Sequence, residues 1–177
     1  EQVDAMVADI DQTFGRLDIL VNNAGGALFG RTEFKPMFDL NFHGTVNCCE
    51  ASAEVMKRQK SGKIVNVGSQ AGMLASQGHS YATSKAAVIH YTRCLAQDLG
   101  PDNIHVNCIA PGYILSSRAI AGGRDEGETK KRLVSQIALG RLGMPEDCAK
   151  VIEFLVTDLS DYVTGQVIPV CGGFVKF

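Results

Sequence analysis

Short apolar runs that alternate with longer helical patterns are the feature that most limits how this chain can fold. The apolar runs occupy residues 17–21, 64–67, 105–110 and 166–170. Nearly continuous hydrophobicity over so few residues is typical of parallel strands that are covered on both faces. The order of helices and strands along the chain predicts right-handed crossover units and a parallel sheet, which defines the α/β class.

The helical patterns begin and end at recognisable signals. Apolar residues at helical spacing predict a helix over 3–14, ended by Gly15, and another over 34–56. Residues 116–136 are polar and rich in glycine, which is typical of a mobile lid over a site. Pro169 lacks a backbone donor, so the last strand is predicted at a sheet edge. We predict one domain over residues 1–177.

The stretch from Ser80 to Lys85 carries the clearest chemical signal. Tyr81 and Lys85 are four residues apart, and residues at this spacing are neighbours on a helix. A phenol with a reference pKa near ~10 becomes a useful proton carrier when a fixed positive charge stabilises its phenolate, and Lys85 is placed to supply that charge. Ser69 follows the strand at 64–67 and points to the same pocket.

Taken alone, the tyrosine and lysine more often indicate a lysine that lies along a half-buried ring. Several further motifs, which follow one another in a fixed order, favour a functional role for this pair. With these motifs the chain resembles the short-chain dehydrogenase/reductase superfamily over nearly its whole length. The motifs are Asn22-Asn23-Ala24-Gly25, Asn41, Ser69, Tyr81 with Lys85, Pro111-Gly112, and Tyr162 to Gly173.

The resemblance implies roles for these residues. Tyr81 would be the general acid and base, Ser69 would bind the substrate oxygen, Lys85 would hold the ribose of the cofactor, and Asn41 would distort its helix so that a carbonyl holds a water near Lys85. Contacts to NAD or NADP are implied for Asn23, Ala24, Gly25, Tyr81, Lys85, Pro111, Gly112, Ile114 and Ser116. The resemblance also implies a homotetramer or homodimer, built through the helices that begin near Phe38 and Tyr81.

The implied fold is a Rossmann-type doubly wound sheet whose first strands are absent from this sequence. No glycine-rich turn that could hold a pyrophosphate at a helix N-terminus is present. We therefore expect a truncated or incomplete chain, with no activity by itself and with an exposed strand edge at Ile19.

Three functions remain open at this point. The first is an oxidoreductase that moves a hydride between a nicotinamide cofactor and a carbonyl or secondary alcohol, a small molecule. The second is the narrower case of a 3-oxoacyl-carrier-protein reductase. The third is a non-catalytic family member that acts as an assembly partner. The spacing of Tyr81 and Lys85 weighs against enoyl reductases, whose lysine lies further from the tyrosine.

The net charge and the cysteines limit the kinds of partner, metal site and compartment that we expect. The formal net charge is −2, and no basic block or long apolar run is present, so neither a nucleic acid nor a membrane is expected as a partner. The six cysteines and four histidines share no metal-type spacing, which predicts no metal site. The cysteines are typical of small buried side chains in a reducing compartment, and we expect a cytoplasmic protein.

Overall fold

The computed structural model describes residues 1–27, 33–75 and 78–174. Its sheet has four parallel strands in the order β1-β2-β3-β4. These strands are β1 (Ile19–Asn22), β2 (Gly62–Val67), β3 (Ile104–Pro111) and β4 (Val167–Val170). The predicted α/β fold with a parallel sheet is confirmed, and β4, which contains Pro169, lies at an edge as expected.

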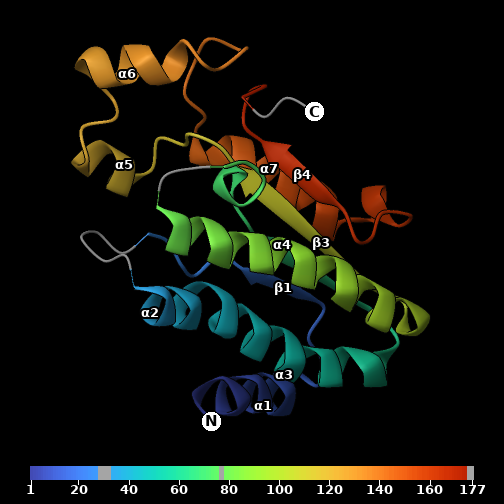
Figure 1. Cartoon of the computed structure of the whole chain (residues 1–177). Helices are drawn as coiled ribbons and strands as arrows, with labels where there is room; N and C mark the ends of the chain where they lie inside the picture. Colours follow the sequence, from blue (N-terminus) through green and yellow to red (C-terminus); the bar gives the residue numbers. More distant parts are fainter. Residues whose placement is uncertain (28–32, 76–77, 175–177) are drawn as a thin grey trace.

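Helices cover both faces of this sheet (Figure 1). One face is covered by α3 (Gly44–Gln59) and α4 (His79–Leu99), and the other by α7 (Pro145–Val156). The remaining helices are α1 (Gln2–Phe14), α2 (Phe34–Phe38), α5 (Ser117–Ala121) and α6 (Gly127–Val134). No helix in the described ranges is long and apolar enough to cross a bilayer.

The side chains of β2 point alternately to the two faces of the sheet, which explains why neighbouring residues of this strand are both apolar. Ile64 packs with Leu95 in the cluster on the α3 and α4 side, whereas the next residue, Val65, packs with Leu155 of α7. Successive side chains of a strand point to opposite faces, so a strand covered on both sides must be apolar at both positions. On β1, by contrast, Ile19 is 44% exposed, as predicted for an uncovered edge.

Helix α1 ends where the sequence predicts. Gly15 adopts a left-handed conformation with φ of 70°, and its N–H donates to the Asp11 carbonyl. Its apolar residues are only partly buried, because Val7 is buried but Met6 and Phe14 are 48% and 71% exposed. The helix packs against α3, which covers only a narrow strip of its surface.

The helix predicted over 34–56 is present, and it changes type in its middle. Helix α2 runs into a π-helix at Asp39–His43, and only then does α3 begin. A π-helix inserts an extra residue into a turn and is frequently found at functional sites. Asn41 lies within it, so the local distortion expected from the resemblance is present.

The 116–136 segment forms α5 and α6, which stand at the top left of Figure 1, away from the sheet. Leu133 packs with Ile137 and Leu142, and Tyr113 and Leu115 pack against this cluster. The segment is therefore anchored through its own small apolar cluster.

Candidate active site

Helix α4 carries Tyr81 and Lys85 near its N-terminus, one turn apart. The short 3-10 helix Gln70–Gly72 packs directly on this turn, because an added Cβ at Gly72 would lie 2.7 Å from the Lys85 carbonyl carbon and from the Ala86 nitrogen. Ser69 precedes that 3-10 helix, its hydroxyl accepts the Ala71 N–H at 3.2 Å, and its side chain lies close enough to Tyr81 to lower the pKa of the phenol. The structure thus brings Ser69, Tyr81 and Lys85 together.

Lys85 is only 4% exposed, and its Nζ donates to the Val67 carbonyl at 2.8 Å. Burial disfavours the charged ammonium and lowers the pKa of Lys85 to about 8. The loop after β1 lies close to this ammonium, because an added Cβ at Gly25 would lie 3.5 Å from Lys85 Nζ.

Burial also shifts the pKa of Tyr81, but in the opposite direction. Removal from water raises the pKa of the phenol, while the Ser69 hydrogen bond and the charges of Arg118 and Arg124 partly oppose this rise. Lys85, which the sequence predicts as a further source of opposing charge, donates to the Val67 carbonyl from the same helix as Tyr81.

Asn41 joins the π-helix to the loop that follows β1. Its side chain is fully buried, accepts the Gly26 N–H at 2.8 Å, and donates to the carbonyls of Gly26 at 3.1 Å and Met37 at 3.0 Å. The Asn41 carbonyl accepts a hydrogen bond from the Thr45 hydroxyl at 2.9 Å.

The predicted cofactor residues lie on loops that leave the same edge of the sheet. Asn22 pairs with Asn66 and Val67 with Ile109 in the parallel register, so the carboxyl ends of β1, β2 and β3 meet there. Asn23, Ala24 and Gly25 are exposed residues after β1.

The turn after β3 is fixed by backbone contacts. Gly112 N–H donates to the Val170 carbonyl at 2.9 Å, and Ile114 N–H donates to the Gly112 carbonyl at 3.1 Å. Pro111 ends β3. The Ser116 hydroxyl caps α5 by accepting the Ala119 N–H at 3.3 Å. This local use of the Ser116 hydroxyl was not expected.

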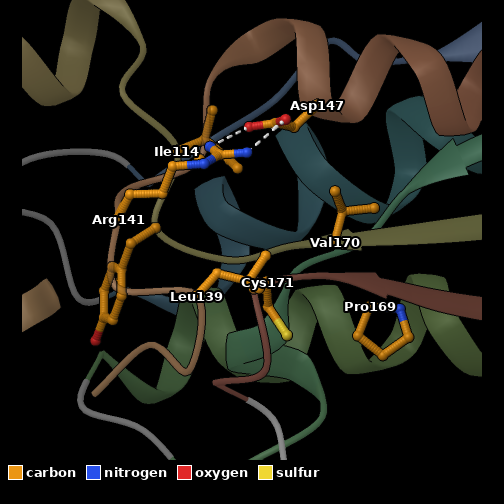
Figure 2. Close-up of a pocket in the computed structure, with 10 residues that line it drawn as sticks. Ile114, Leu139, Arg141, Asp147, Pro169, Val170 and Cys171 are labelled. Atoms are coloured by element: carbon orange, nitrogen blue, oxygen red, sulfur yellow. Dashed lines mark hydrogen bonds and ion pairs between the residues drawn. The ribbon is translucent and has the colours of Figure 1, made fainter. Parts of the chain in front are cut away.

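A cavity of about 270 Å³ lies beside β4, and Tyr81 is not among the residues that line it (Figure 2). Arg141 and Asp147 line it and form a two-pronged ion pair with distances of 2.7 and 3.0 Å. Of the predicted site residues, only Ile114 reaches its lining. The acid/base group and this cavity are therefore separate features.

Sequence reasoning did not identify Gly72, Arg118 or Arg124. The close packing of Gly72 depends on a helix that comes later in the chain, and nothing in its neighbours indicates it. The arginines lie in the polar 116–136 segment, where many charges are equivalent in the sequence. No pattern in that segment distinguishes the two arginines whose charges lower the pKa of Tyr81.

Comparison with known proteins defines the class. A family model described as "Enoyl-(Acyl carrier protein) reductase" matches residues 1–175. The chain belongs to the short-chain dehydrogenase/reductase superfamily, a class of NAD(P)-dependent oxidoreductases, which confirms the predicted family and enzyme class.

Curated relatives agree with this assignment. A cyclohexanol dehydrogenase of Rhodococcus sp. is 48% identical, covering 94% of this chain and 66% of the relative. A 3alpha-hydroxysteroid dehydrogenase of Mediterraneibacter gnavus is 39% identical, covering 97% and 70%. The 3-oxoacyl-[acyl-carrier-protein] reductase FabG of Thermotoga maritima is 40% identical, covering 99% and 73%. The chain thus spans about two thirds of the length of the first of these relatives.

Solved structures agree as well. A gluconate 5-dehydrogenase from Burkholderia cenocepacia in complex with NADP and tartrate has a TM-score of 0.91 at 30% identity, covering 98% of this chain and 70% of that one. The structure of ElxO with NADP bound has a TM-score of 0.89 at 32% identity, covering 98% and 73%. Both of these solved structures have NADP bound.

Proposed function

We propose that this protein transfers a hydride between a nicotinamide dinucleotide and a small carbonyl compound or secondary alcohol, with Tyr81 as general acid and base. The observation that carries the proposal is the placement of Tyr81 one turn from the buried Lys85 ammonium, with Ser69 close enough to lower the pKa of the Tyr81 phenol, at the carboxyl edge of a parallel sheet. Ligands of open α/β sheets bind at this edge.

The residues present fit the ribose end of such a cofactor. An ammonium has three donors, and Lys85 uses one for the Val67 carbonyl, which leaves two for the hydroxyls of a ribose. Asn41 fixes the backbone of the loop after β1 at Gly26, beside Lys85. When bound, the cofactor supplies or accepts the hydride.

The protein moves the proton. In reduction, the Tyr81 hydroxyl donates to the substrate oxygen while the Ser69 hydroxyl donates a second hydrogen bond to the same oxygen. In oxidation, Tyr81 must first lose its proton. Because burial raises the Tyr81 pKa, reduction is favoured near neutral pH, and oxidation should accelerate as the pH rises.

A narrower candidate is reduction of 3-oxoacyl groups. The observation in its favour is the 40% identity to the Thermotoga maritima reductase over 99% of the chain. The greater identity to a cyclohexanol dehydrogenase favours a simple secondary alcohol instead.

Association with further copies is part of the proposal. The half-buried Ala82 and Ala87 give α4 a small-residue surface suited to close helix packing, whereas Ala86 is covered at its backbone by Gly72. A homodimer or homotetramer would use α3 and α4. The fully buried Cys49 and Cys108 suit a reducing compartment, so we place the protein in the cytoplasm.

The test is a substrate panel on the purified complete protein. Cyclohexanol, a 3α-hydroxysteroid and a 3-oxoacyl thioester would each be assayed with both dinucleotides, alongside a thermal-shift titration with the dinucleotides. We expect turnover of at least one substrate and a shift that follows RT ln(1 + [L]/Kd). Binding without turnover of any substrate would favour the assembly-partner alternative, and absence of both would overturn the proposal.

A further inference from the structure

Arg118 is a cation without an acidic partner in the described part of the chain, and it lies beside the proposed site. Its guanidinium contacts the loop after β1, because an added Cβ at Gly26 would lie 2.1 Å from Arg118 Nη1. Its hydrogen bond joins Nη1 to the Ala27 carbonyl at 3.4 Å, which is long. A guanidinium has five donors, so most of its capacity is unused.

Two features make this placement unusual for a surface arginine. The side chain reaches across the chain from α5 to a loop 91 residues earlier, and that same loop is clamped by the buried Asn41. The charges of Arg118 and Arg124 also both act on the Tyr81 phenol, so positive charge gathers where the substrate oxygen would lie. An unpaired guanidinium next to a partly buried phenol favours an anionic ligand.

We propose that Arg118 forms a binding site for a carboxylate or phosphate group beside Tyr81, with Arg124 adding to the positive charge. The proposal rests on the proposed function, since it names the chemical class of ligand that the Tyr81 pocket takes. The planar fork of arginine matches the paired oxygens of either group. Those oxygens belong either to an acidic substrate or to the phosphates of the dinucleotide.

A matched pair of ligands separates these two sources. 3-Hydroxybutanoate and its methyl ester differ in the negative charge but share the secondary alcohol, and inorganic pyrophosphate represents the dinucleotide phosphates. Binding of each would be measured by calorimetry on the complete protein, as wild type and as Arg118→Met. Turnover of the acid and of the ester would be measured on the same samples.

We expect Arg118→Met to weaken binding of one anion about tenfold or more, because a hydrogen-bonded charge contact is lost. Loss confined to 3-hydroxybutanoate, with the ester unchanged, would assign the site to the substrate. Loss confined to pyrophosphate would assign it to the dinucleotide. Arg118→Lys should fall between the wild type and Arg118→Met, because a point charge replaces the fork.

Arg132→Met is the matched control, since Arg132 is an exposed arginine of α6 in the same segment. It should bind all three ligands as the wild type does. Unchanged binding of both anions by Arg118→Met, or equal losses in Arg132→Met, would overturn the proposal. Because calorimetry needs no turnover, a protein that binds anions through Arg118 but oxidises neither alcohol would contradict the proposed function alone.

Discussion

Burial sets the protonation of the two central residues, and it acts on them in opposite directions. It raises the pKa of Tyr81 and lowers the pKa of Lys85, because each neutral form is favoured away from water. Tyr81 therefore holds its proton firmly, which suits an acid in reduction. The Lys85 ammonium loses its charge at a pH close to the physiological range.

The lowered pKa of Lys85 has a consequence for stability that can be measured. Between about pH 8 and the unfolded value near ~10.4, the unfolded chain binds the lysine proton more tightly than the folded chain. The contribution of Lys85 to the free energy of unfolding therefore rises with pH across this window, by at most ~1.4 kcal/mol per pH unit. Other groups add their own slopes, so the difference between variants carries the information.

Lys85→Met should lack this rise when its urea unfolding is compared with that of the wild type from pH 8 upward. Lys130→Met is the control, because Lys130 is exposed on α6, and it should keep the wild-type slope. Parallel stability curves for the wild type and Lys85→Met would show that Lys85 titrates as an ordinary exposed lysine.

At the scale of elements, the site depends on how closely the 3-10 helix Gln70–Gly72 approaches α4. An added Cβ at Gly72 would lie 2.7 Å from backbone atoms of Lys85 and Ala86, and backbone cannot move aside as a flexible side chain can. Gly72→Ala should therefore push Ser69 away from Tyr81. We expect a destabilisation of ~1–3 kcal/mol and a loss of turnover of up to ~10²-fold.

Gly100→Ala is the control for this substitution, because no atom lies within 4 Å of an added Cβ at Gly100. Its unfolding midpoint and turnover should match the wild type closely. Wild-type turnover by a stably folded Gly72→Ala would mean that the close packing does not position Ser69.

The elements also show how far a sequence can be interpreted. Tyr81 and Lys85 were predictable because their relation is local to one helix, and the strands because burial on both faces makes them apolar throughout. Hydrophobic periodicity did not predict the π-helix at Asp39–His43, because the apolar pattern of the helix continues before and after it. Only the resemblance indicated a distortion at Asn41. Arg118 was missed because a contact across 91 residues sets its place.

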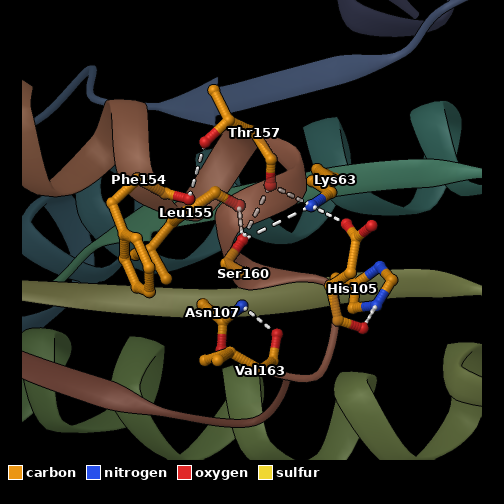
Figure 3. A network of polar contacts seen from close by, with 9 residues as sticks. Lys63, His105, Asn107, Phe154, Leu155, Thr157, Ser160 and Val163 are labelled. Carbon is orange, nitrogen blue, oxygen red and sulfur yellow. Dashed lines mark hydrogen bonds and ion pairs between the residues drawn. The ribbon is translucent and has the colours of Figure 1, made fainter.

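At the scale of the whole molecule, a polar network ties the segment between α7 and β4 to strands β2 and β3 (Figure 3). Lys63 of β2 donates to the Thr157 carbonyl and pairs with Asp161 at 2.7 Å. Asn107 of β3 donates to the Val163 carbonyl at 2.9 Å and accepts the Gln166 N–H at 3.0 Å. These contacts hold the segment between α7 and β4.

Lys63 lies near the start of β2, whereas Ser69 follows its end, so about 20 Å of strand separates them. Lys63→Met should lower the free energy of unfolding by ~1–3 kcal/mol, because a charge-assisted hydrogen bond to Thr157 is lost. The Kd for the dinucleotide should stay unchanged. Lys57→Met, which removes an exposed ion pair with Glu54, should cost under about 1 kcal/mol. Equal costs for the two variants would show that the network adds nothing.

The central claim is that Tyr81 carries the proton, and single-turnover kinetics of Tyr81→Phe test it most directly. Tyr91→Phe is a close control, because Tyr91 lies on the same helix and its buried hydroxyl has no partner among the described residues. We predict that Tyr81→Phe lowers the rate of hydride transfer ~10²–10⁴-fold while the dinucleotide Kd stays near the wild-type value, and that Tyr91→Phe changes neither. A Tyr81→Phe protein that keeps more than about a tenth of the wild-type rate would contradict the claim.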